Sequence, residues 1–344
     1  MYLVGDFIPQ KAKFSVPDFG NELVLANLEG PVCRDGLEPI AKVGPHLHSA
    51  PFELNGRWAF TLANNHFMDY RAEGMRETQE FLKSKGFSSG GAGETENQAR
   101  EILWLSEQGK KMAVICCCEH QFGVAASHAP GVAAQGPWVV MTIADARQKG
   151  ADVVIVSSHA GSESTKFVSP RLRALYHSWI DAGADVIHGH HAHVPQGWES
   201  YKGRPIFYGL GNFVVKEDDW VSDPNQLWSL FVRLDLSQGQ LRWSVEKTGR
   251  VSVGASDYLT EANRIFADDK LLRDTWINFA NEQYARYYRP YMTLSLRSAL
   301  GWLRRPIAMR LLLTNFKTCE NHIDIIESAN EYKRHGYEYD DETI

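Results

Sequence analysis

The chain has 344 residues, of which 44% are hydrophobic and 23% charged, a composition typical of a globular protein with one large domain and an appendage. Its formal net charge of -6 provides no general attraction to nucleic acid or to an anionic membrane. The five cysteines show no Cys-x-x-Cys spacing, which argues against both a disulfide framework and a thiolate metal site.

The amino terminus reads Met1-Tyr2-Leu3-Val4-Gly5-Asp6, and no basic stretch precedes an apolar one there. A run of about 18 apolar residues, the length needed to span a bilayer, occurs nowhere in the sequence. We therefore expect a cytoplasmic protein without a signal peptide or a transmembrane segment.

In chain order, short apolar segments predict strands, and each of these strands is followed by a side chain of a metal-binding type. The strands are expected at residues 2–4, 23–26, 57–62, 151–157 and 186–187. The side chains that follow them are Asp6, Glu29, Asn65 with His66, His159, and His191 with His193. A single Gly-Asp or Asn-Asn pair is explained equally well by a turn, so it is the recurrence that carries weight.

Helices are expected between these strands, at residues 71–85, 137–149 and 171–182. Hairpins are expected from three pairs of segments, residues 101–106 with 111–118, 197–201 with 205–210, and 227–236 with 240–246. Residues 34–55 have the composition of a long surface loop. This order predicts an α/β fold with added antiparallel strands, in which a site lies beyond the carboxyl ends of the strands.

Four histidines, His188, His190, His191 and His193, fall within the segment 184–196 at the end of one predicted strand. Neutral imidazole binds metals, and closely spaced rings at a strand end can enter one cleft. A surface histidine tract, or core histidines bonded to the backbone, is the alternative for this segment alone. Together with the acids and amides of the other strand ends, the set favours a site for Mn, Fe or Zn.

The sequence resembles the CapA (PGA_cap) family of bacterial capsule and poly-γ-glutamate synthesis proteins, which is itself similar to the calcineurin-like metallophosphoesterases. The resemblance covers about residues 1–250. The motifs that carry it are Gly5-Asp6, Asn27-Leu28-Glu29-Gly30-Pro31, Ala63-Asn64-Asn65-His66-x-x-Asp69, Gly91-Ala92-Gly93, His159-x-Gly161-x-Glu163, Gly189-His190-His191-Ala192-His193-Val194-x-Gln196 and Gly209-Leu210-Gly211-Asn212-Phe213.

The resemblance implies a metallophosphatase-like sandwich of mixed sheets flanked by helices, with a catalytic domain at residues 1–252 and a helical extension at 253–344. It implies a metal-binding role for six residues, Asp6, Glu29, Asn65, His159, His191 and His193. One or two ions are expected, because Phe7-Ile8-Pro9 follows Gly5-Asp6 in place of the Asp-x-His of true phosphoesterases.

The resemblance also implies a catalytic group. His66 would be the general acid, Asp69 would orient it, and Glu163 would lie behind the ligands or on the substrate side. The expected activity is metal-dependent hydrolysis of a phosphate mono- or diester in capsule, polysaccharide or poly-γ-glutamate metabolism. The expected substrate is phosphorylated or an acidic polymer. The alternatives are a non-catalytic or transferase-like assembly factor, and a metal-dependent γ-glutamyl amidase.

The carboxyl-terminal part is basic, and its predicted apolar helices lie at residues 294–317. Its basic residues are Arg286, Arg289, Arg297, Arg304, Arg305, Arg310 and Lys317, with no acid between them. Such a segment suits contact with an acidic polymer, a membrane surface or a partner, and the alternative is a helical cap with a solvated basic face. The oligomeric state is left open.

Overall fold

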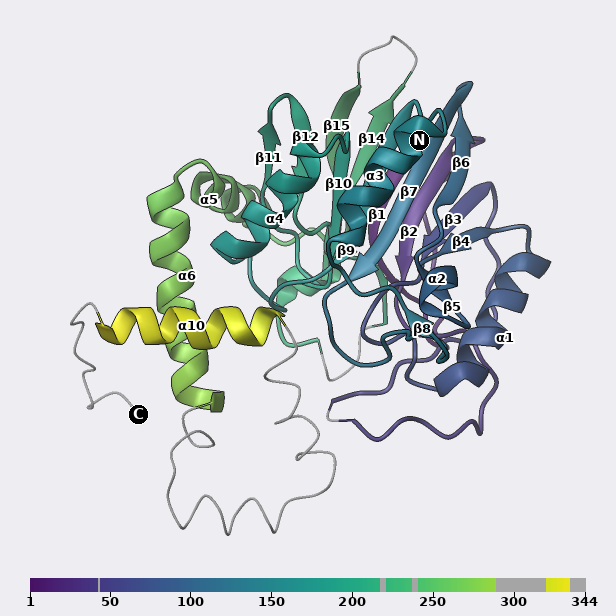
Figure 1. The fold of residues 1–344 in the computed structure, drawn as a ribbon, viewed down its shortest axis with the longest axis horizontal. Helices are drawn as coiled ribbons and strands as arrows, with labels where there is room; N and C mark the ends of the chain where they lie inside the picture. The colour runs from purple at the N-terminus through teal and green to yellow at the C-terminus, as the bar shows by residue number, and fades with distance from the viewer. Residues whose placement is uncertain (43, 217–220, 237–240, 289–319, 335–344) are drawn as a thin grey trace.

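The computed structural model describes residues 1–42, 44–216, 221–236, 241–288 and 320–334, and two mixed β-sheets form its centre (Figure 1). The first sheet has the strand order β15-β14-β1-β2-β3-β4, and β13 pairs with β1. Its strands are β1 (Tyr2–Ile8), β2 (Leu23–Leu28), β3 (Arg57–Thr61), β4 (Ser88–Gly90), β13 (Asn212–Val215), β14 (Trp228–Asp235) and β15 (Arg242–Gly249).

The second sheet has the order β11-β12-β10-β9-β7-β6. Its strands are β6 (Leu103–Glu107), β7 (Lys110–Cys118), β9 (Val153–His159), β10 (Val186–His190), β11 (Trp198–Tyr201) and β12 (Arg204–Phe207). A two-stranded sheet joins β5 (Ala92–Gly93) to β8 (Gly131–Val132). The three predicted hairpins are confirmed, since β6 pairs with β7, β11 with β12 and β14 with β15, each antiparallel.

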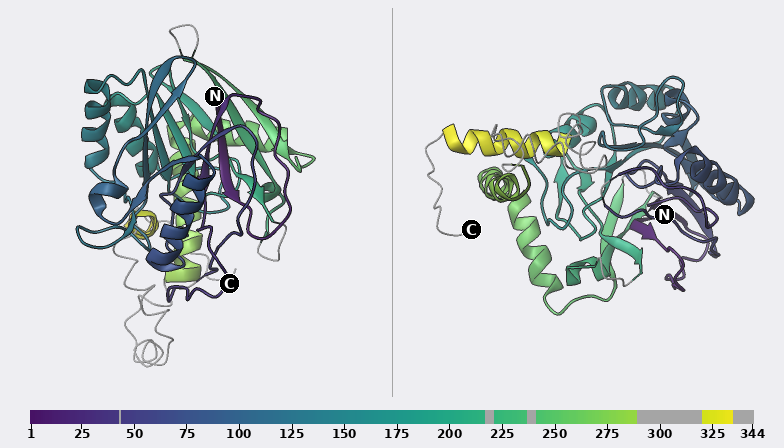
Figure 2. Two further views of the ribbon diagram at one scale, coloured as in Figure 1. Left: turned by 90° about the vertical axis from the view of Figure 1, so that its right-hand side faces the viewer. Right: turned by 90° about the horizontal axis from the view of Figure 1, so that it is seen from below.

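The described helices lie outside the two sheets, five of them in contact with strands and the last two further out. They are α1 (Arg71–Ser84), α2 (Glu96–Ala99), α3 (Trp138–Gln148), α4 (Pro170–Asp181), α5 (Ala255–Phe266), α6 (Asp269–Gln283) and α10 (Glu320–Arg334), with a short 3-10 helix at Pro224–Leu227 and a π-helical turn at Tyr284–Tyr288. Figure 2 shows α10 crossing α6 at the end of the molecule that lies away from α1. The layered α/β arrangement expected from the sequence is confirmed.

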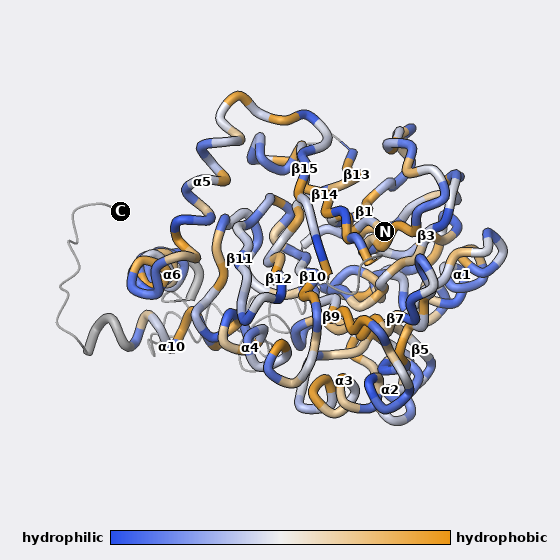
Figure 3. Tube along the Cα trace, turned by 90° about the horizontal axis from the view of Figure 1, so that it is seen from above, coloured by the Kyte–Doolittle hydropathy of each residue, from blue (hydrophilic) through white to orange (hydrophobic). Residues whose placement is uncertain are grey.

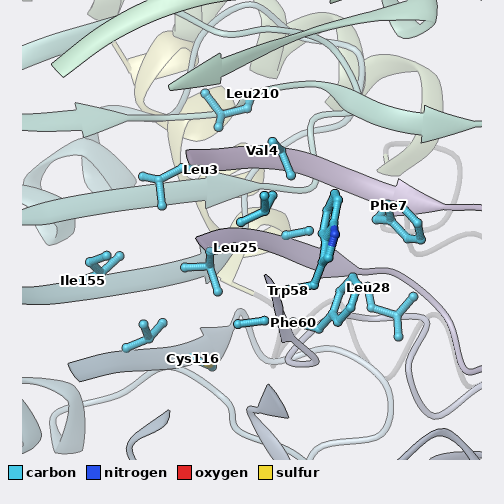
Figure 4. Close-up of a cluster of buried hydrophobic side chains, with 14 of the residues drawn as sticks. Leu3, Val4, Phe7, Leu25, Leu28, Trp58, Phe60, Cys116, Ile155 and Leu210 are labelled. Atoms are coloured by element: carbon cyan, nitrogen blue, oxygen red, sulfur yellow. The ribbon is translucent and has the colours of Figure 1, made fainter. Parts of the chain in front are cut away.

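Strand β7 shows how the sequence produces these layers. Alternate side chains of a strand point to opposite faces. Met112, Val114 and Cys116 lie in the core that contains the strands of the first sheet, part of which is drawn in Figure 4. Ala113, Ile115 and Cys117 lie in the other core, which also contains α3 and α4 side chains. A strand buried on both faces reads as a continuous apolar run. The outer helices α1 and α6 are mainly hydrophilic in Figure 3.

Two glycines allow a close approach of the backbone next to Asp6 and His190. A Cβ on Gly5 would lie 1.8 Å from the carbonyl oxygen of Gly211, and a Cβ on Gly189 would lie 2.0 Å from that of Tyr208. Only glycine fits such contacts. Gly5 precedes Asp6, and Gly189 precedes His190, so these close approaches help to bring their side chains to the same end of the sheets.

The first helix beyond residue 252 packs on the sheets. Ala255 and Leu259 of α5 lie in the core of the first sheet, and Phe266 lies in the core of the second. Further out, α6 and α10 share a separate apolar cluster that contains Trp276, Ala280, Ile325 and Ala329. The division at residue 252 stays a prediction. The apolar helices expected at 294–317, and all the basic residues named above except Arg286, lie outside the described residues.

Candidate metal centre

The predicted ligand residues meet at one end of the two sheets. Register brings Asp6 opposite Asn27 and opposite Asn212, while His190 lies opposite His159 in the second sheet. Strands β1 and β10 are in contact, so the two sets of strand ends face each other. The carboxylates and imidazoles lie close together although they are distant in sequence. Asp6 and His193, for example, are 187 positions apart.

Asp6 is a buried carboxylate with partners on both oxygens. Its Oδ1 accepts a hydrogen bond from Asn27 Nδ2 at 2.9 Å and lies 3.1 Å from His190 Nδ1. Its Oδ2 accepts from the backbone N–H of His191 at 3.3 Å and lies 3.6 Å from His193 Nδ1. Burial raises the pKa of Asp6, but the interactions with the histidines, His190 above all, outweigh burial and hold the pKa below its usual range. Asp6 is therefore ionised at neutral pH.

Glu29 is fully buried, yet neither of its carboxylate oxygens has a hydrogen-bond partner among the described residues. The nearest ring nitrogens are His193 Nε2 at 3.6 Å and His159 Nε2 at 3.8 Å from Oε1. Burial raises the pKa of Glu29 to about 8. A buried carboxylate without a hydrogen bond is costly unless a cation compensates it. This orphaned group fits a divalent cation.

The four clustered histidines divide into two pairs. His188 Nε2 is bonded to the carbonyl of Val4 at 2.8 Å, and the His188 ring packs 4.1 Å from that of His190. For His188, the alternative interpretation, a core histidine bonded to the backbone, is thus confirmed. His191 and His193 follow the strand, with φ angles of 86° and 58°. Left-handed backbone at residues other than glycine is strained and often accompanies functional sites.

Imidazole protonation differs across the site. Burial lowers the pKa of His191 to about 4, so that its ring is neutral, as a metal ligand must be. Burial also lowers the pKa of His193, but the nearby Glu29 and Asp6 outweigh that effect and raise it to about 9. Without a cation, the crowded carboxylates therefore share protons with His193.

The amide side chains hold the ligands in place. Asn27 Nδ2 lies 3.2 Å from His159 Nδ1 as well as bonding Asp6, and the other ring nitrogen of His159 lies 2.9 Å from Asn65 Oδ1. Asn212 Oδ1 lies 3.0 Å from His193 Nδ1. Asn27 and Asn212 belong to the motifs quoted above, but nothing in those motifs indicated these positioning contacts.

His66 and Asp69 form the expected pair, and a third residue joins them. His66 Nδ1 lies 2.8 Å from Asp69 Oδ2 and 2.9 Å from Lys42 Nζ, and Lys42 also forms an ion pair with Asp69. Asp69 further accepts from the backbone N–H of Leu47 at 2.8 Å. Burial lowers the pKa of both His66 and Lys42. No sequence pattern marked Lys42, since it lies in an irregular loop.

Two groups of three side chains could each hold an ion. Asp6, Glu29 and His193 form one, and Glu163, His191 and His193 form the other, with ligand atoms within 4.8 Å of one another in each group. Glu163 is exposed, so it borders the mouth of the site and is a candidate ligand as well as a substrate-side group. Glu119, which the sequence did not indicate, brings Oε1 to 3.9 Å from His191 Nε2.

The fold and this cluster define an α/β protein with a candidate metal centre made of carboxylates, amides and imidazoles. Residues 18–217 match the family described as bacterial capsule synthesis protein PGA_cap, and the chain belongs to that family. The family membership expected from the motifs is thus confirmed.

Individual relatives agree with this membership. The chain is 32% identical over 210 residues to the capsule biosynthesis protein CapA of Bacillus anthracis, covering 57% of this chain and 51% of that protein. It is 37% identical over 158 residues to the PGA biosynthesis protein CapA of Bacillus subtilis (strain 168), covering 45% and 42%. A probable polyglutamine synthesis accessory protein of Mycobacterium tuberculosis is 32% identical over 166 residues, covering 44% of each chain. The chain thus spans about half the length of these relatives.

Among solved structures, the 5'-nucleotidase precursor from Thermus thermophilus aligns with 62% of this chain and 43% of its own, at a TM-score of 0.34 and 15% identity. Within the described residues, no helix is both long enough and apolar enough to cross a bilayer.

Proposed function

We propose that this protein is a metal-dependent hydrolase that cleaves phosphate mono- or diesters in capsule, polysaccharide or poly-γ-glutamate metabolism. The observation that carries the proposal is Glu29, whose fully buried carboxylate lacks hydrogen bonds among the described residues and faces His159 and His193. Such a group is stable in the interior when a cation neutralises it.

The residues that would hold the cation are Asp6, Glu29, Asn65, His159, His191 and His193, with Glu163 as an additional ligand. A divalent ion bound there would supply Lewis acidity toward a phosphoryl oxygen. Mixed oxygen and imidazole ligands suit Mn, Fe or Zn. His193 belongs to both groups of three ligands, so the proposal allows one ion or two.

The remaining residues have roles in orientation and proton transfer. Asn27 bonds Asp6 and His159, and it fixes both relative to each other. His66 is the proposed proton donor to the leaving oxygen, and its Nδ1 is anchored by Asp69 and Lys42. The substrate in this proposal is phosphorylated or an acidic polymer, and binding of nucleic acid is not expected.

The test is a substrate panel of aryl phosphate monoesters and diesters, with a γ-glutamyl amide measured beside them. We expect turnover of an ester with Mn²⁺, loss of turnover with EDTA, and loss in the variants His191→Ala and His66→Ala. Turnover that is indifferent to all three changes would remove the proposal. Turnover of the amide alone would favour a γ-glutamyl amidase at the same centre.

An assembly factor is the second candidate, favoured by the similarity to the probable polyglutamine synthesis accessory protein of Mycobacterium tuberculosis. It would bind poly-γ-glutamate without cleaving it, through the basic carboxyl-terminal segment. Polymer binding that survives EDTA but is lost in Arg304→Glu with Arg305→Glu would support it. Contact of this segment with a membrane surface remains part of the same proposal.

A further inference from the structure

The first turn of α10 lies against two loops that border the candidate metal centre. One loop, residues 160–169, connects β9 to α4 and carries Glu163. The other follows β7 and carries Glu119. In Figure 1, α10 runs from its carboxyl-terminal end at the edge of the molecule toward the ends of the central strands. More than 150 residues separate Ser162 from the helix residue that it contacts, Asn321.

The contact adjacent in sequence to Glu163 is between Ser162 and Asn321. Ser162 Oγ donates a hydrogen bond to Asn321 Oδ1 at 2.9 Å, and the Ser162 side chain is buried. Ser162 directly precedes Glu163, whose carboxylate shares a ligand group with His191 and His193. Because neighbouring residues share a peptide unit, fixing the Ser162 side chain restricts where the Glu163 carboxylate can lie.

The other end of the same loop is held by Asp324. Its Oδ2 accepts from Ser169 Oγ at 2.6 Å, and its Oδ1 lies 3.1 Å from Arg171 Nη1. Ser169 also caps α4 by accepting from the backbone N–H of Leu172 at 3.0 Å. One helix turn therefore fixes both ends of the loop.

The second loop is attached to the residue before Asn321. Glu320 Oε2 accepts from the backbone N–H of His120 at 2.8 Å. His120 follows Glu119, whose Oε1 lies 3.9 Å from His191 Nε2. The same turn of α10 thus anchors both acids that approach His191 from outside the sheet ends.

The helix itself is firmly attached. Ile325 and Ala329 of α10 pack with Trp276 and Ala280 of α6, and Trp276 Nε1 donates to Ser328 Oγ at 2.9 Å. These contacts leave α10 little freedom to move away from the loops. The hydrogen-bonding face of α10 can therefore set the loop geometry.

We propose that α10 is a positioning element of the metal centre, and that Asn321 is the residue through which it places Glu163 opposite His191 and His193. This inference rests on the proposed function, because it requires that a cation binds at this centre. It assigns the carboxyl-terminal helix to the same functional unit as the sheets.

The test measures Mn²⁺ affinity by isothermal titration calorimetry, separately from thermal stability measured in EDTA. Asn321→Ala and Ser162→Ala remove the same hydrogen bond from its two sides, and each should weaken Mn²⁺ binding about 3- to 10-fold. The double variant should be no weaker than either single variant, because the bond is already lost. Asn321→Asp keeps the acceptor and should restore the affinity.

Asn330→Ala is the matched control, because Asn330 is an exposed residue of the same helix. It should bind Mn²⁺ as the wild type does. Equal affinities for Asn321→Ala and Asn330→Ala, or additive losses in the double variant, would overturn this inference while leaving the proposed function intact. A wild-type protein that binds no Mn²⁺ would overturn both.

Discussion

Glu29 Oε1 lies 3.6 Å from His193 Nε2 at the centre of the cluster, and both side chains are buried. The pKa of each is raised, to about 8 for Glu29 and to about 9 for His193. A buried carboxyl–imidazole pair that retains protons at neutral pH, beside an ionised Asp6, forms a site that a divalent cation would complete by displacing protons.

Cation binding should therefore release protons. Glu29 and His193 titrate as a coupled pair, and because both pKa values are raised, the pair holds at least one proton at pH 7 in the cation-free protein. Metal ligands, by contrast, must be deprotonated. We expect about one to two protons released per cation at pH 7, and an affinity that rises as the pH approaches 9. Calorimetric titration in two buffers of different ionisation enthalpy measures the number. No release at pH 7 would contradict the assignment of Glu29 and His193.

The variant Glu29→Gln should separate stability from cation binding. A folded-state pKa of about 8, against an ordinary value of 4.5, means that the folded protein holds the proton more tightly. The contribution of Glu29 to stability is therefore lost as pH rises from 4.5 through 8. The Gln variant does not lose stability in this way. At high pH and in EDTA, its free energy of unfolding should therefore exceed that of the wild type by on the order of 1–3 kcal/mol.

Urea unfolding at pH 5 and pH 8.5 measures that gain, and the exposed Glu80 of α1 provides the control substitution Glu80→Gln. The same Glu29→Gln protein should bind Mn²⁺ much more weakly than the wild type. Parallel pH profiles for Glu29→Gln and wild type would show that Glu29 is not a strained, buried carboxyl group.

The loss of activity caused by removing the His66 ring should depend on the leaving group of the substrate. If His66 donates a proton to the leaving oxygen, His66→Ala should lower kcat/KM for an alkyl phosphate by roughly 10²- to 10⁴-fold. The effect on p-nitrophenyl phosphate should be smaller, because p-nitrophenolate leaves without a proton. Exposed His128 gives the control His128→Ala. Equal losses on both substrates would indicate another role for His66.

Removal of Lys42 should destabilise the protein, because the buried carboxylate of Asp69 would lose the ammonium group that pairs with it. The side chains of Lys42 and Asp69 are 3% and 0% exposed. Breaking such a pair costs about 3–5 kcal/mol, so Lys42→Met should lower the free energy of unfolding by that amount. Adding Asp69→Asn should recover most of the loss. The exposed pair of Lys11 and Asp35 is the control, and Lys11→Met should cost at most about 1 kcal/mol. A Lys42→Met protein as stable as Lys11→Met would contradict the buried pair.

The order of the longer strands and helices could be predicted from periodicity, but the short strands β5, β8 and β13 and the ends of the strands could not. The strand expected to stop at Val4 continues to Ile8, and the one expected to stop at Ile187 continues to His190. These extensions direct His188 and His190 toward β1, where they contact Val4 and Asp6, and His191 and His193 follow at the strand end. Local pattern cannot reveal this, because the extended pairing is stabilised by neighbouring strands.

Sequence alone indicated a site residue mainly where a side chain of a metal-binding type follows a predicted strand. Lys42 could not be found that way, since its position depends on a loop held to Asp69 through Ile40, Leu47 and the lysine itself. Asn321 could not be found either, because its role arises from a contact with Ser162 that is distant in sequence.

The central claim is that this cluster binds a divalent cation, and titration of the metal-free protein with Mn²⁺ tests it most directly. The wild type and His128→Ala should bind one or two ions per chain at the same affinity, and His191→Ala should lose at least about tenfold, the lower end of the effect of altering a metal site. Absence of saturable binding by the wild type, or an unchanged affinity in His191→Ala, would contradict the account.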